Sequence, residues 1–140
     1  MRIGARRIQI TSTLASVCVT WALLAISGAQ AQQAPRHITL KSGESTELRN
    51  FYFVDRQCRS LMIGMPVVDV LEGPEELTVA LKEGPKVPAK CTNRVPGGAV
   101  VATAKEIKAR KEAKLTIRLT FKTRIGERQS SSSYLVTLFP

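Results

Sequence analysis

Histidine is nearly absent from this chain, because His37 is the only one among 140 residues. A Ser-His-Asp constellation would have to be built on His37 itself, and a zinc site would need four ligands, of which only one could be a histidine. The sequence has no Gly-x-Gly-x-x-Gly or Walker motif, no oxygen-ligand loop spaced for calcium and no Gly-x-Ser-x-Gly elbow. We therefore expect no enzyme activity, no cofactor and no metal.

Carboxylates and aromatic residues are also few, and their positions favour structural roles. A catalytic carboxylate pair for glycoside hydrolysis would have to come from Asp55, Asp69, Glu72, Glu75, Glu76 and Glu83. Three of these flank the Gly73-Pro74 turn, where solvated acids are common. Nucleic acid is bound by basic grooves with stacking aromatics. Tyr52 and Tyr134, the aromatics that could be exposed, lie outside the basic part of the chain, so we expect no nucleic-acid partner.

The first 31 residues have the order of a secretory signal peptide. A basic start with Arg2, Arg6 and Arg7 precedes the apolar run "LASVCVTWALLAIS" and the small residues Ala29 and Ala31. The run of about 14 residues is shorter than the roughly 20 that a spanning helix needs. We predict Sec-type export, cleavage after Ala31, a periplasmic or secreted location and no transmembrane segment after cleavage.

Three alternatives fit the N-terminus less well. An uncleaved anchor would need a longer apolar run. The twin arginine Arg6-Arg7 can direct folded proteins to a dedicated exporter, but Gln9 stands where an apolar residue is usual. Lipid attachment at Cys18 would require a small residue in place of Val17, and the apolar run continues past this cysteine.

The remaining chain is long enough for one domain. We expect a flexible leader at 32–36 and a single domain at 37–140. Removing three arginines leaves 21 − 3 = 18 basic residues against 11 acidic ones, a net charge of +7. This charge favours anionic partners but says nothing about the fold.

Two cysteines follow the predicted cleavage site, Cys58 and Cys91. An even pair in an exported chain indicates one disulfide. Closing this loop of 34 residues, counting both ends, corresponds to about 3–4 kcal/mol of stabilisation. A redox pair would be spaced more closely, as in Cys-x-x-Cys.

Alternating apolar and polar residues between Gly and Pro turns predict a β-protein. We expect strands at 37–41, 45–54, 66–74, 76–85, 98–104, 114–122 and 128–139. A short edge strand near Val87 is compatible with the pattern. Between the fifth and sixth strands, 104–112 favours a short helical turn that crosses from one sheet to the other, because Thr103 and Glu106 have capping-box spacing. Ile107 is the only large apolar residue there.

About seven strands with frequent turns predict an all-β, immunoglobulin-like sandwich, and a small closed β-barrel is the alternative. In the sandwich, the disulfide would join the connection between the second and third strands to the loop before the fifth or sixth strand.

The stretch "KARKEAKLTIRLTFKTRIGER", residues 108–128, contains eight basic and two acidic residues. Part of it alternates, so that Leu115, Ile117 and Phe121 should face the core while the basic residues of 114–122 face solvent. The candidate anion-binding residues are Lys108, Arg110, Lys111, Arg118 and Lys122. They form a patch only if the first three lie on the same side of the protein as the last two.

The segments "CRSLMIGMPVVDVLEGP", "VPGGAVVATA" and "IGERQSSSSYLVTLFP" resemble a loose group of small exported bacterial proteins with immunoglobulin-like sandwiches and no established function. In that group a cysteine precedes a Pro-Val-x-Val strand, a second cysteine precedes a Gly-rich strand start, and a Gly-x-x-Arg turn opens the final strand. The resemblance covers about 58–140. It implies a fold and an exported location, and it brings no catalytic residue.

We therefore expect an exported, non-enzymatic module that is structural or binds another protein, for example by strand addition at a sheet edge. The alternative is a module that binds an anionic envelope polymer or a membrane surface through its basic residues. An enzyme or an enzyme inhibitor is the third and weakest hypothesis.

Overall fold

The computed structural model describes residues 34–140, so the predicted signal peptide lies outside the described residues. These described residues form seven strands, which confirms the predicted number and approximate positions. Their bounds are β1 (Arg36–Lys41), β2 (Ser45–Phe51), β3 (Val67–Glu72), β4 (Leu77–Glu83), β5 (Gly98–Ala104), β6 (Lys111–Thr123) and β7 (Gly126–Phe139). Within residues 34–140 no helix is long and apolar enough to cross a membrane.

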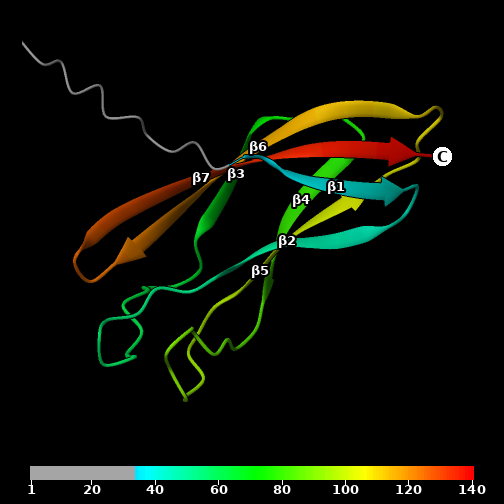
Figure 1. Cartoon of the computed structure of the whole chain (residues 1–140). Coiled ribbons are helices and arrows are strands. Elements are labelled where there is room, and N and C mark those ends of the chain that lie inside the picture. The colour runs from blue at the N-terminus through cyan, green and yellow to red at the C-terminus, as the bar shows by residue number, and fades with distance from the viewer. Residues whose placement is uncertain (1–33) are drawn as a thin grey trace, which may run out of the picture. The chain divides into compact units, whose positions relative to one another are not determined.

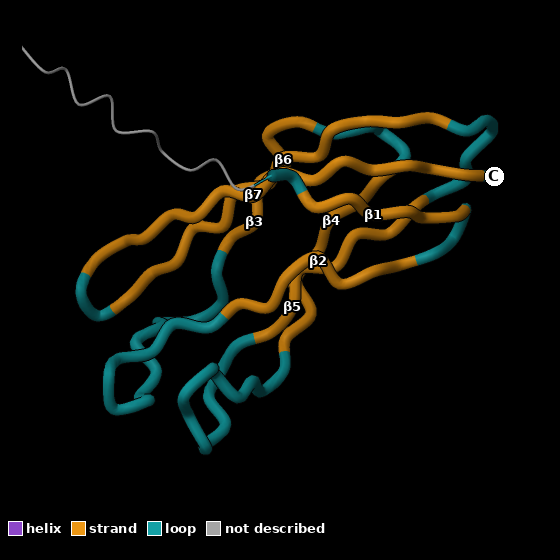
Figure 2. The backbone as a smooth tube through the Cα atoms, viewed as in Figure 1, coloured by secondary structure: helices purple, strands orange, loops and turns teal. Residues whose placement is uncertain are grey.

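The strands form two sheets, with orders β1-β7-β6-β3 and β2-β5-β4. Neighbouring strands are antiparallel, except that β1 runs parallel to β7. An immunoglobulin domain likewise divides its third, sixth and seventh strands from its second, fourth and fifth. The predicted all-β sandwich is thus confirmed, and the described strands do not close into a barrel (Figures 1 and 2).

The core lies between the two sheets and follows the predicted alternation. Leu115, Ile117 and Leu119 of β6 are all buried, and Phe121 is nearly so. Tyr134 of β7 is also buried, although we expected that it could be exposed. Its register partner is Leu115, so both side chains enter the same core. The alternation of β7 directs the Tyr134 side chain into the core, although this side chain carries a polar hydroxyl.

The predicted helical turn at 104–112 is wrong. No helix occurs in the described residues; β5 continues to Ala104 and β6 already begins at Lys111. The short connection still crosses from one sheet to the other, as expected. Ile107 explains the extended path, because its side chain is 4% exposed in the core and its backbone N–H donates to Ser42 Oγ over 2.8 Å.

β2, β3 and β4 are shorter than predicted, and the edge strand near Val87 is reduced to a single bridge. β2 ends at Phe51 rather than at residue 54, because the chain leaves the sheet before the Cys58 turn. Near Val87 there is only an isolated antiparallel bridge between Lys86 and Val95. Gly98 begins β5 where an added Cβ would collide with the Lys82 carbonyl oxygen, which explains the glycine at this position.

The β6–β7 hairpin is longer than its neighbours. β1 pairs with β7 only from Tyr134 to Phe139, whereas β6 pairs with β7 from Gly126 onward. The hairpin therefore extends beyond the start of β1 (Figure 1). Within residues 34–140, the segment 126–133 of β7 has a strand on only one side.

Candidate functional site

Lys111, the first residue of β6, faces the second sheet. Lys111 has the same parity as Leu115, so its side chain points toward the inner side of the sheet. Its Nζ lies 2.7 Å and 2.8 Å from the two carboxylate oxygens of Glu76, which precedes β4. Lys111 is therefore part of an ion pair between the two sheets.

Arg110 and Lys108 belong to the connection before β6. Arg110 Nη2 lies 3.1 Å from Glu112 Oε1. The guanidinium carbon of Arg110 is 5.3 Å from the centre of the Phe139 ring. This geometry is a cation–π contact. Lys108 is exposed at a bend of the connection.

The other two candidate residues lie on the outer face of β6. Arg118 pairs with Asp69 of β3 over 3.3 Å, and Lys122 is exposed near the hairpin turn. Lys111 and Lys122 are separated by about 36 Å along the strand and by its two faces. That separation far exceeds the screening length of about 8 Å at physiological salt, so the five residues do not form one patch.

The remaining candidates for chemistry have structural partners. His37 Nε2 lies 2.8 Å from Thr137 Oγ1 on the neighbouring strand. Glu72 pairs with Lys114 on the sheet surface over 3.2 Å. No group of three or more potential metal ligands occurs among residues 34–140.

Two carboxyl groups have a perturbed pKa, and both perturbations are structural. Backbone N–H donation from Arg59 is the main cause that lowers the pKa of Asp55. The side-chain hydrogen bond from Lys111 is the main cause that lowers the pKa of Glu76. A carboxyl group with a lowered pKa is ionised near neutral pH, so it is poorly suited to donate a proton as a general acid.

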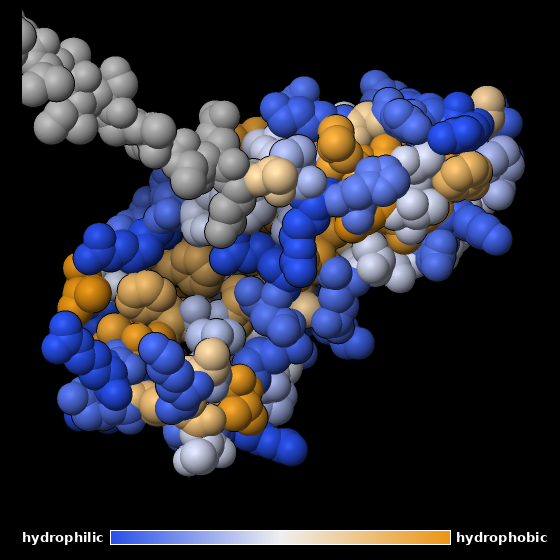
Figure 3. Space-filling view, viewed as in Figure 1, coloured by the Kyte–Doolittle hydropathy of each residue, from blue (hydrophilic) through white to orange (hydrophobic). Residues whose placement is uncertain are grey.

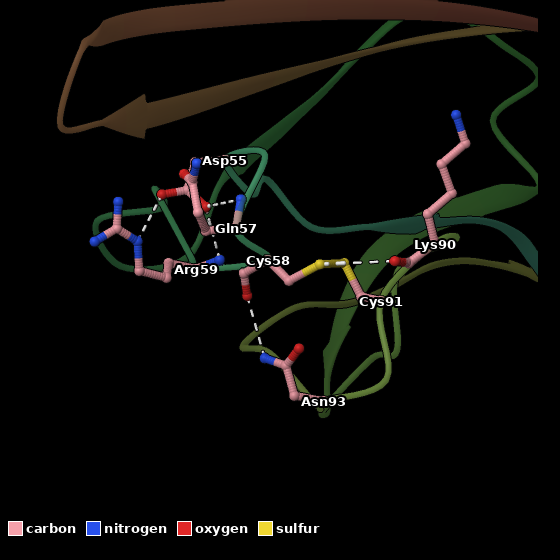
Figure 4. Close-up of a disulfide and its surroundings, with 7 residues drawn as sticks. All are labelled: Asp55, Gln57, Cys58, Arg59, Lys90, Cys91 and Asn93. Carbon is pink, nitrogen blue, oxygen red and sulfur yellow. Dashed lines mark hydrogen bonds and ion pairs between the residues drawn. A yellow bond between two sulfur atoms is a disulfide. The ribbon is translucent and has the colours of Figure 1, made fainter.

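The predicted disulfide between Cys58 and Cys91 is present. It joins the β2–β3 connection to the β4–β5 connection, as expected from the topology (Figure 4). Asn93 supports it by donating to the Cys58 carbonyl over 3.1 Å, and Asp55 accepts hydrogen bonds from the backbone of the same turn. The two loops are thus held together at the end of the sandwich.

An exposed apolar edge is the feature that the sequence did not predict. Five of the eight exposed large hydrophobic residues in the described chain lie within 63–71, namely Ile63, Met65, Val67, Val70 and Leu71. They lie on and just before β3, the last strand of its sheet. We call these five residues the β3 apolar edge. Their exposed fractions range from 40% to 57%, so most of them have about half of their surface in solvent.

Backbone pairing extends this edge beyond β3 itself. Ile63 donates its N–H to the Lys122 carbonyl over 2.8 Å, and Met62 forms a bridge with Thr123. Met62, Ile63 and β3 are therefore bound to β6 on one side, and no described strand pairs with their other side. The signal in the sequence is the apolar content of "LMIGMPVV", but its pattern predicts only an irregular connection and the start of a strand.

Comparison of the chain with protein-family models, with curated proteins and with solved structures finds no match.

Proposed function

We propose that this protein is an exported, non-enzymatic β-sandwich that binds another protein through the β3 apolar edge. The observation that carries the proposal is the concentration of exposed apolar side chains on and just before a strand whose outer side pairs with no other described strand. The signal-like N-terminus supports the exported location. The structural partners of His37 and of the surface glutamates support a role without catalysis.

An edge of this kind is unusual for a protein that acts alone. Natural sheets protect their edges with charges, bulges or covering loops, because an open edge can pair with other chains. β3 has a bulge between Val70 and Glu72, and Pro66 precedes it. These features limit indiscriminate pairing, yet Met65, Val67 and Leu71 still expose apolar surface. A partner strand could pair with the edge while covering these side chains.

Binding of an anionic polymer has less support. Lys111, Arg110 and Arg118 are each paired with a carboxylate, and the candidate residues lie on different faces. A polymer would have to displace these pairs one at a time, at sites too far apart to act together.

Site-specific photo-crosslinking in the producing cells tests the proposal. A photoreactive amino acid replaces Val67, which is 57% exposed, and in a matched control it replaces Val87, which is 53% exposed away from the edge. We expect a discrete protein adduct from position 67 alone, and we expect Leu71→Lys to remove it. Equal adducts from both positions, or adducts unaffected by Leu71→Lys, would contradict binding at this edge.

A further inference from the structure

The unpaired part of β7 lies at the opposite edge of the sheet from β3. Alternate residues of a strand direct their backbone N–H and C=O groups to its two sides. Along 126–133 one of these sides faces β6, and the other has no described strand beside it, since β1 starts opposite Tyr134. A strand that continued the line of β1 could pair with these backbone groups.

Arg49 faces the same space from the second sheet. A bulge between Glu47 and Arg49 shifts the register of β2, and a bulge changes the direction of the side chains that follow it. Arg49 therefore shares a face with the buried Phe51, and its register partner is the fully buried Val100. Arg49 thus points inward, where its neighbours in the sandwich are apolar.

Two hydroxyls of β7 hold this guanidinium in place. Arg49 Nη1 donates to Ser130 Oγ over 3.1 Å and to Ser132 Oγ over 2.8 Å. The register pairs these serines with Leu119 and Ile117, whose side chains are buried. Ser130 and Ser132 therefore face inward, next to the unpaired edge of their own strand.

No carboxylate within the described chain compensates this positive charge. Arg49 takes part in no ion pair among residues 34–140, and neither does Arg128, which shares the inward face because it is the register partner of Phe121. Keeping a partly buried cation next to neutral hydroxyls alone is unfavourable compared with pairing it with an anion. Two arginines on one face beside an unpaired edge are complementary to an acidic strand.

The arrangement of the hairpin leaves the space accessible. Figure 3 shows apolar surface exposed between the hairpin and the loops at the other side of the sandwich, with hydrophilic side chains around it. Phe53 contributes to this region, since its ring centre lies 6.5 Å from that of Phe121, and it is only partly buried.

We propose that the unpaired edge of β7 at 126–133 binds an extended acidic segment of a partner protein by strand addition, with an acidic side chain of that segment paired to Arg49 and Arg128. The added strand continues the line of β1. Main-chain hydrogen bonds to β7 supply affinity, and the two arginines select carboxylates at alternate positions. This site is separate from the β3 apolar edge and does not depend on the function proposed for it.

Synthetic peptides provide a direct test with the purified domain. The probe is an acetylated and amidated seven-residue peptide that alternates Thr and Glu, and the comparison peptide carries Gln in place of Glu. In about 0.15 M salt, which screens diffuse attraction, we expect calorimetry to detect the Glu peptide and to give at least tenfold weaker binding for the Gln peptide. We also expect Arg49→Gln and Arg128→Gln each to weaken the Glu peptide about tenfold.

The controls separate strand addition from general attraction to a basic protein. Lys122→Gln removes a charge from the same hairpin on its outer face and should leave the affinity unchanged. N-methylation of a single peptide amide should abolish binding only when the methylated amide is one of the alternate amides that face β7. Methylation of an amide that faces away from β7 should leave binding intact. If Arg49→Gln fails to fold, Arg128→Gln serves as the test of charge. Absent binding of the Glu peptide, equal binding of both peptides, equal loss in Lys122→Gln or indifference to N-methylation would each overturn the proposal.

Discussion

Removal of the disulfide should cost a large part of the stability of this domain. Cys58 and Cys91 are 33 positions apart, so the cross-link closes a loop of 34 residues. The chain-entropy relation for such a loop gives about 3–4 kcal/mol at 25 °C. This is a large fraction of the roughly 5–15 kcal/mol that stabilises a typical domain, and it corresponds to a fall of roughly 15 °C in Tm.

The native structure explains why the loss should come mainly from the unfolded state. The turn that contains Cys58 is held independently, because Asp55 accepts backbone hydrogen bonds from Gln57 and Arg59 at 2.9 Å. Lys86 and Val95 likewise keep the second loop together by reciprocal backbone hydrogen bonds. The folded chain should therefore keep its shape without the cross-link, while the unfolded chain gains freedom.

Urea unfolding of the oxidised protein, the reduced protein and the Cys58→Ser/Cys91→Ser variant measures the effect. The reduced protein serves as the control for the substitutions themselves, since Cys58 has a left-handed backbone conformation with φ of 60° that serine would also have to adopt. We expect the reduced protein and the double serine variant, which both lack the disulfide, to lose about 3–4 kcal/mol relative to the oxidised protein. A loss below about 1 kcal/mol in both would refute the entropic reasoning.

Two further predictions concern the ends of the sandwich. Ile107→Ala should lower the free energy of unfolding by about 2–5 kcal/mol, because it leaves a cavity beneath the β5–β6 connection. Denaturant unfolding measures this loss, with Val87→Ala as the control at an exposed position. Equal losses in the two variants would show that Ile107 is not a core residue. Because the pKa of Glu76 is lowered mainly by Lys111, the pair should stabilise the fold above the unfolded pKa of about 4.3 and lose this contribution as pH falls through the depressed folded pKa. Unfolding at pH 7 and pH 3 should therefore show a difference between wild type and Lys111→Gln that shrinks at pH 3, and a constant difference would contradict the pair.

The strands could be predicted because their signals are local. Alternation in 114–122 and the Gly-Pro turns after β3 and β4 depend on neighbouring residues alone. The prediction of a helical turn at 104–112 was wrong for the opposite reason. Its propensity and capping pattern were local, but the path was decided by Ile107, whose burial and hydrogen bond to Ser42 involve a turn 65 positions away. Weak local preferences yield to the burial of one large apolar side chain.

The two surfaces proposed to bind partners could not be predicted because they depend on which strands are neighbours. The sequence shows apolar residues around Met65 and a basic residue at Arg49, but not that β3 is an edge strand or that β1 begins only opposite Tyr134 of β7. The bulge that turns Arg49 inward leaves no clear pattern in "STELRNF" either, since Leu48 and Arg49 read as ordinary alternation. The density of charge in the sequence does not locate a binding surface either. The most basic stretch, 108–128, has much of its charge neutralised by ion pairs within the fold. The proposal of an acidic partner therefore depends on arginines that lack a carboxylate partner in the described chain, and not on the stretch with the most positive charge.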